Sequence, residues 1–307
     1  GKSEIMRANL IGVGYWGSFI YKTLKEIGFK EICLCDPEVP GAHNNYKKMD
    51  DAEFIFIATP VSSHYEICEY FLSRGKRVFC EKPLVVNEVA ATNLYNLAER
   101  HNTYLFVDWV FTYNYGFEII KQYITDKTLN SNSSPIQDIH MRRRNTNIDH
   151  ISDISAKLDL AGHDLSILLK LTDQVPLAAH WHEYKKRKDS IQMDSAIGYL
   201  TFATFNVTVD VSWYNAYKDR ECIIKLSDEE YIVWNDAKQI ISIQKNFRDY
   251  PVTINYNTHA SPLERSIKQF LVFNETAYQE QKQLTYNILR ILNNDNKIIS
   301  NSYYPGS

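Results

Sequence analysis

The chain has 307 residues, of which 44% are hydrophobic and 23% are charged, a composition typical of folded proteins rather than disordered ones. This length predicts two domains of ordinary size. Its 34 basic and 37 acidic residues give a formal net charge of -3, so we expect no nucleic-acid partner.

Cysteine content and hydropathy indicate the cellular compartment of the protein. Five cysteines, an odd number in a long chain, do not suggest a disulfide framework and are typical of a reducing compartment. No apolar run approaches the roughly 20 residues of a membrane span, and the first residues lack a signal-peptide pattern. We therefore predict a cytoplasmic protein that does not associate with a membrane.

Strands and helices alternate over about the first 110 residues. Apolar runs predict five strands, at residues 5–11, 30–35, 54–58, 78–80 and 104–107. Helical patterns separate most of them, at residues 18–27, from Ser62 or Ser63 to about Ser73, and at 87–101. The exception is the loop-like segment 38–50. This alternation predicts an α/β domain with a parallel, doubly wound sheet over residues 1–112.

The pattern changes in the remaining residues, 113–307. We expect a helix at 117–125, a polar loop at 126–135, a strand at 136–144 and a helix at 158–171. Long β-like stretches follow at 177–184, 195–213, 221–234 and 239–246, and helices at 261–275 and 283–293 close the chain. These elements predict an α+β domain with a large, open, mostly antiparallel sheet.

A glycine pattern follows the first predicted strand. Gly12, Gly14 and Gly17 have the spacing that lets backbone amides approach a pyrophosphate at the start of a helix. Asp36, 19 residues after Gly17, ends the second strand, where a carboxylate accepts hydrogen bonds from a ribose diol. Because this acid repels a 2′-phosphate and no arginine follows it, NAD is favoured over NADP. The alternative is a tight structural turn without a ligand.

A second candidate site lies where the fourth strand ends, at Glu81-Lys82-Pro83. Proline cannot donate to a sheet ladder, so the strand stops and presents the Lys82 ammonium at its carboxyl end. Ligands bind at this edge of open α/β sheets. Lys82 is therefore a candidate for proton chemistry or for contacting an oxyanion, the alternative being a surface lysine beside a turn.

Asp159 and His163 form a third candidate site. Four residues apart on a predicted helix, they share one face, so the carboxylate can orient the imidazole and raise its basicity. Asp164 is a second possible partner, and a purely structural Asp–His pair is the alternative. His180 and His182 alternate on a predicted strand without an evident third ligand, so we expect no metal site.

Together these motifs resemble the Gfo/Idh/MocA oxidoreductase family over nearly the whole chain. The resemblance rests on the glycine turn, the segments Ala58–His64 and Gly75–Leu84, and the Asp159/His163 spacing. Members acting on nucleotide-linked sugars are most similar, through the segments Gly14–Gly17, Thr59–Glu66, Phe111–Asn114 and Arg144–Asn145.

The resemblance implies a Rossmann domain, a second domain whose open sheet forms a homodimer or homotetramer, and hydride transfer between a sugar or nucleotide-sugar carbinol and NAD. It implies that Lys82 contacts the reacting hydroxyl, that His163 is the acid/base and that Asp159 binds or orients beside it. The implied cofactor contacts are Gly12, Gly14, Tyr15, Trp16, Gly17, Asp36, Thr59, Pro60, His64, Glu81 and Lys82. The implied substrate contacts are Lys82, Asp108, Tyr113, Arg144, Asn145, Asp159 and His163. For Arg142–Arg144, alternating exposure on an edge strand is the structural alternative.

Two features depart from the family. Only 14 residues separate Asp36 from Asp51, too few for the usual helix and strand, so the adenosine side of the pocket is open or altered. Asp108 stands where relatives often carry a different residue. These departures leave open a catalytically silent dinucleotide-binding regulator or scaffold. A ketosugar reductase running the reverse reaction also stays open, because the same residues serve both directions.

Overall fold

The computed structural model describes residues 6–148, 152–245, 251–256 and 260–294; the start of the first predicted strand, residue 5, lies outside them. The chain forms two compact units. The first comprises Gly1–Val110 with Leu263–Tyr286, and the second comprises Phe111–Pro262 with Asn287–Ser307.

The first unit contains a five-stranded sheet in the order β2-β1-β3-β4-β5. Every neighbouring pair is parallel, which confirms the predicted doubly wound sheet. All four residues of β3 are buried, as its continuous apolar run requires. The strands are β1 (Arg7–Ile11), β2 (Glu31–Cys35), β3 (Phe54–Ile57), β4 (Arg77–Glu81) and β5 (Leu105–Asp108).

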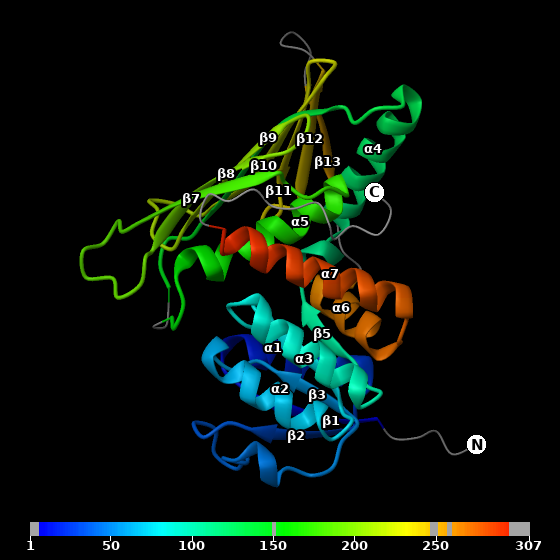
Figure 1. Ribbon diagram of the computed structural model, residues 1–307, viewed down its shortest axis with the longest axis vertical. Helices are drawn as coiled ribbons and strands as arrows, with labels where there is room; N and C mark the ends of the chain where they lie inside the picture. Colours follow the sequence, from blue (N-terminus) through cyan, green and yellow to red (C-terminus); the bar gives the residue numbers. More distant parts are fainter. Residues whose placement is uncertain (1–5, 149–151, 246–250, 257–259, 295–307) are drawn as a thin grey trace. The chain divides into compact units, whose positions relative to one another are not determined.

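Helices from both ends of the chain pack in this unit. The helices α1 (Tyr15–Ile27), α2 (His64–Leu72) and α3 (Glu88–Arg100) alternate with the strands (Figure 1). Residues 263–286, which the sequence-based division places in the second domain, supply nearly all of α6 (Pro262–Leu271) and most of α7 (Glu275–Leu292). Phe270 of α6 lies with its ring centroid 5.4 Å from that of Phe56 and 5.5 Å from that of Phe79, so an aromatic cluster fastens α6 to the sheet.

The segment between β2 and β3 is short, as its 14 residues predict. Its regular structure is the 3-10 turn η1 (Tyr46–Lys48), and β2 is an edge strand of the sheet. His43 forms an isolated parallel bridge with Cys35, and the Tyr46 hydroxyl donates to Glu66 of α2 at 2.7 Å. The segment therefore covers the edge where another strand would otherwise pair.

The second unit contains an eight-stranded sheet in the order β13-β12-β11-β10-β6-β9-β8-β7. β6 and β9 are parallel and the other pairs are antiparallel, which confirms a large, mostly antiparallel sheet. Two of the long predicted stretches are each a pair of strands joined by a turn, and β13 was not predicted. The strands are β6 (Ile136–Arg144), β7 (Ala178–Tyr184), β8 (Ser195–Thr201), β9 (Asn206–Ser212), β10 (Asp219–Leu226), β11 (Glu230–Asn235), β12 (Ile240–Lys245) and β13 (Val252–Asn255).

Helix α4 (Tyr115–Ser131) corrects the predicted loop at 126–135, because its last turns continue through residue 131. Lys127 pairs with Glu230 at 3.0 Å and with Asp228 at 2.7 Å, so contacts with a distant turn hold polar residues in a helix. The helix ends at Asn132, whose φ of 55° is left-handed. None of the helices in the described ranges is long and apolar enough to cross a membrane.

Candidate active site

The glycine turn of the first unit leaves room for a ligand at one position only. A Cβ on Gly12, whose φ is +92°, would lie 2.5 Å from the Ala58 carbonyl oxygen, and one on Gly17 would lie 2.0 Å from the Gly12 oxygen. A Cβ on Gly14 would meet no heavy atom within 4 Å. Gly12 and Gly17 thus close the turn, while Gly14 keeps open space at the start of α1, as dinucleotide binding requires.

The structure brings Asp36 to this turn. Its Oδ2 accepts a hydrogen bond from the Val13 amide at 2.8 Å, and its Oδ1 accepts from the Glu38 amide at 2.9 Å. The predicted pairing of the glycine turn with an acid at the end of β2 is therefore present in space. Nearby, Tyr15 is 81% exposed and its ring meets that of Phe19 edge-on.

His64 joins two strand ends. Its ring is buried, with Nδ1 2.9 Å from the Pro83 carbonyl oxygen and Nε2 2.8 Å from the Thr59 carbonyl oxygen. The Ser63 hydroxyl donates to Thr59 Oγ1 at 2.6 Å. The structure therefore places Thr59, Pro60 and His64 at the carboxyl edge of the sheet, and the imidazole contacts the segments that follow β3 and β4.

The ends of β4 and β5 bring three charged residues together. Glu81 is the last residue of β4 and pairs in register with Asp108, the last of β5. Lys82 follows directly and is partly buried, and its peptide bond to Pro83 is cis. Asp108 is fully buried, and its Oδ1 accepts the Ser266 hydroxyl at 2.6 Å. The predicted substrate contact at Asp108 thus lies within the first unit, beside Glu81.

In the second unit, Asp159 lies in a π-helical turn, η4 (Lys157–Ala161), that runs directly into α5 (Gly162–Thr172). The helix predicted for 158–171 is therefore present, and its first turn is π-helical rather than α-helical. Asp159 Oδ2 accepts the indole N–H of Trp213 at 2.8 Å. π turns recur at functional sites, because they re-aim side chains that an α-helix would stack in line.

His163, in the first turn of α5, packs against an aromatic ring. Its centroid is 4.6 Å from that of Phe111, at an interplanar angle of 82°. The Arg143 guanidinium also lies 4.5 Å from the Phe111 centroid. Phe111 therefore contacts both a candidate acid/base and a buried cation.

Arg143 is buried among carboxylates. It contacts Asp164 at 3.1 Å and Asp236 at 3.7 Å. Burial works against the guanidinium charge, yet Asp164 and Asp236 outweigh it and raise the pKa of Arg143. Burial raises the pKa of Asp164, although Arg143 opposes that shift. Arg143, Asp164 and Asp236 line a small pocket together with Arg220 and Trp234.

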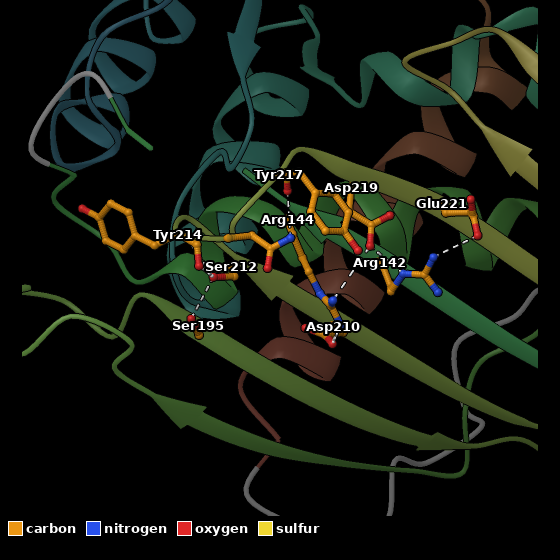
Figure 2. A network of polar contacts seen from close by, with 10 residues as sticks. Arg142, Arg144, Ser195, Asp210, Ser212, Tyr214, Tyr217, Asp219 and Glu221 are labelled. Carbon is orange, nitrogen blue, oxygen red and sulfur yellow. Dashed lines mark hydrogen bonds and ion pairs between the residues drawn. The ribbon is translucent and has the colours of Figure 1, made fainter. Parts of the chain in front are cut away.

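Arg144 points away from this cluster. Arg143 pairs with Asp164 of α5, and successive side chains of a strand face opposite sides. Arg142 and Arg144 therefore lie on the other face of the sheet, where Figure 2 shows them with their partners. There Arg144 pairs with Asp210, and Arg142 donates to Asp219 at 2.8 Å. The structure therefore does not bring Arg144 to His163.

Two further predicted contacts lie in the second unit. Asn145 follows β6, and its amide donates to the Ser212 carbonyl at 2.8 Å. Tyr113 lies in the 3-10 turn η3 (Val110–Tyr113), with the Lys170 ammonium 5.9 Å from its ring centroid. These interactions do not identify a ligand for Asn145 or Tyr113. The described residues contain no group of three or more histidines, cysteines or acids that could hold a metal ion.

Residues 6–109 match a family model described as "Oxidoreductase family, NAD-binding Rossmann fold". This chain carries the nucleotide-binding domain of the Gfo/Idh/MocA oxidoreductase family. The match confirms the resemblance predicted from the glycine turn and the Glu81-Lys82-Pro83 block. The open space at Gly14 and the carboxylate of Asp36 fit the dinucleotide that the family description implies.

Among curated relatives of the family, inositol 2-dehydrogenase of Serratia proteamaculans (strain 568) is 26% identical over 141 residues, which are 45% of this chain and 40% of that protein. The aligned stretches of the four matching curated proteins span 17% to 40% of those proteins' own length.

Solved structures extend the likeness of fold to nearly the whole chain. UDP-N-acetylglucosamine 3-dehydrogenase GnnA from Acidithiobacillus ferrooxidans is 18% identical with a TM-score of 0.74, covering 94% of this chain and 95% of that one. GenD2 from gentamicin A biosynthesis, in complex with NAD, is 15% identical with a TM-score of 0.75, covering 95% and 94%. The fold of this chain therefore resembles that of these two solved structures over nearly its whole length.

Two residues of these sites were not predicted. Trp213 lies 54 residues from Asp159, and no local pattern signals their hydrogen bond. Arg143 could have been placed, because the apolar residues Ile139 and Met141 predict that its side of the strand is buried.

Proposed function

We propose that this protein is an NAD-dependent oxidoreductase that transfers a hydride between a sugar or nucleotide-sugar carbinol and the nicotinamide. The observation that carries the proposal is Lys82 at the carboxyl end of β4, in a domain whose glycine turn keeps space for a dinucleotide. Two relatives support the substrate class, since their names give an inositol and a UDP-linked sugar as substrates.

A bound nicotinamide would supply the hydride acceptor. We assign the Lys82 ammonium to the carbinol oxygen, where it stabilises the negative charge that develops as the hydride leaves. We assign His163 as the base that takes the hydroxyl proton, because an imidazole titrates near neutral pH. Asp159, held by Trp213, binds or orients the substrate beside it.

The cofactor preference follows from Asp36. Its carboxylate is held at the glycine turn by two backbone amides, where it would accept a ribose diol and repel a 2′-phosphate. We therefore propose NAD rather than NADP. A cytoplasmic location and a homodimeric or homotetrameric assembly stay predictions, supported by cysteine usage and by the family resemblance.

Replacement of one lysine tests these roles. Lys82→Ala should abolish turnover while leaving NAD binding measurable by calorimetry. Lys268→Ala, whose side chain is 57% exposed on α6, is the matched control and should keep full turnover. Unchanged turnover in Lys82→Ala would overturn the role of this residue.

The substrate is tested by following NADH absorbance with UDP-linked, dTDP-linked and free sugars. A signal in the oxidative direction supports the dehydrogenase, and consumption of NADH with ketosugars alone supports the reductase. Tight NAD binding without a signal from any sugar in either direction would favour the regulator or scaffold, which the shortened segment 37–50 and the buried Asp108 motivate.

A further inference from the structure

Two carboxyl groups meet at the carboxyl edge of the five-stranded sheet. Glu81 and Asp108 are register partners on the neighbouring parallel strands β4 and β5, so their side chains leave the sheet on the same side. Their exposed fractions are 9% and 0%. Neither the glycine turn nor the proposed hydride transfer requires two buried acids at this point.

The hydrogen bonds of the pair leave two oxygen atoms without a donor. Asp108 Oδ1 accepts the Ser266 hydroxyl at 2.6 Å. Asp108 Oδ2 and Glu81 Oε1 are buried, and no donor in the described part of the chain bonds to either. Their strand register places the two side chains next to each other on neighbouring strands, which are about 4.8 Å apart in a sheet. Because an ionised carboxylate only accepts, these groups can bond only if one of them carries a proton.

The surroundings favour that proton. Burial, and then the charge of Asp108, raises the pKa of Glu81 well above its ordinary value, although Trp16 and Lys82 oppose the shift. Burial also raises the pKa of Asp108, while Glu81, Ser266 and Lys82 oppose it.

The remaining titratable neighbours supply no compensating positive charge. Cys80, on β4, interacts electrostatically with both acids and with Cys68 of α2. Burial raises the pKa of the Cys80 thiol, which keeps it neutral. Lys82 is the positively charged side chain whose electrostatic influence reaches both acids.

We propose that Glu81 and Asp108 share a single proton at neutral pH and act as a positioning pair for Lys82. The pair then carries one negative charge against the one positive charge of the ammonium. Loss of the shared proton would add a second negative charge and draw the ammonium toward the strand ends, away from a ligand. The role toward Lys82 rests on the proposed function, whereas the shared proton does not.

Infrared spectroscopy of the full-length protein without substrate tests the shared proton. At pH 7 exposed carboxyls are ionised, so a carbonyl band of a protonated carboxyl reports a buried group. We expect this band in the unmodified protein and its loss in both Glu81→Gln and Asp108→Asn, each of which keeps a hydrogen bond and a single negative charge. Glu26→Gln, on the exposed face of α1, is the control and should retain the band. Absence of the band from the unmodified protein would overturn the shared proton.

The pH dependence of NAD affinity, measured by calorimetry, tests the positioning role without using turnover. We expect affinity in the unmodified protein and in Glu26→Gln to fall at alkaline pH, and Glu81→Gln to lose this alkaline fall. Identical profiles in all three proteins would overturn the positioning role even where the infrared band is present. If no sugar is oxidised or reduced, the proposed function fails. The infrared band and the pH dependence of NAD affinity still test the shared proton and its effect on Lys82.

Discussion

The two units bury charge in different ways. At the ends of β4 and β5, the first unit buries two acids side by side, and a shared proton removes one of the two like charges. In the second unit, Arg143 lies between Asp164 and Asp236, and opposite charges compensate one another. Both clusters lie beside candidate catalytic residues, Lys82 in one unit and, through Phe111, His163 in the other.

The difference shows that the energetic cost of burying charged groups can be offset either by a shared proton or by a counter-ion. The two arrangements respond to different perturbations. A proton can be removed by raising the pH, so the acid pair is sensitive to solvent conditions. An arginine cannot be deprotonated in a protein, so the cation of its cluster persists as the pH rises, and the cluster depends on every partner. Substitutions in each cluster can therefore separate the two.

The largest effect is expected from Arg143→Met. It leaves Asp164 and Asp236 buried without their cation and should lower the free energy of unfolding by about 3–5 kcal/mol in urea. Arg187→Met, at an arginine whose side chain is 51% exposed and which pairs with Asp189, is the control and should leave the unfolding midpoint unchanged. Equal effects of the two substitutions would show that the Arg143 cluster is not electrostatically essential.

Ser266→Ala should have an intermediate effect. It removes the hydroxyl that donates to Asp108 Oδ1 and leaves a buried acceptor without that donor, which costs about 1–3 kcal/mol of unfolding free energy. Ser227→Ala, on an exposed turn, is the control. A melting temperature of Ser266→Ala equal to that of the control would mean that the acid pair does not depend on this hydroxyl.

A pH-dependent effect is expected from Glu81→Gln. Because the pKa of Glu81 is raised in the folded state, its contribution to stability is complete below the ordinary glutamate pKa of about 4.3 and is lost as pH rises toward the folded value. From pH 6 to pH 7, the unmodified protein should therefore lose up to about 1.4 kcal/mol relative to Glu81→Gln. Parallel thermal unfolding profiles for the two proteins would contradict proton sharing.

The smallest effect is expected from Arg144→Gln, one residue from the largest. Its side chain is 26% exposed and pairs with Asp210 on the opposite face of the sheet, so the loss should stay within about 1 kcal/mol. The free energy of unfolding of Arg144→Gln is measured in urea in parallel with that of Arg143→Met. A loss as large as that of Arg143→Met would mean that both faces of β6 act energetically as buried surfaces.

Much of the first unit was predictable because its signals are local. The apolar runs of β1 to β5, the glycine turn and the missing helix after Asp36 are all legible in short windows of sequence. The second unit was less predictable, since turns within 195–213 and 221–234 divide apolar stretches into strand pairs without a strong break signal. The helix through residues 126–131 depends on Lys127 meeting Asp228 and Glu230, about a hundred residues later.

The sequence by itself determined the nucleotide-binding domain, the strand end that presents Lys82 and the spacing of Asp159 and His163, because periodicity and short-range sterics encode such features. Only the tertiary structure decided that Glu81 faces Asp108, that Trp213 holds Asp159 and that Phe270 of α6 packs on the first sheet. These contacts depend on strand register and on how distant segments of the chain pack together. The sequence around each residue gives no local signal of them.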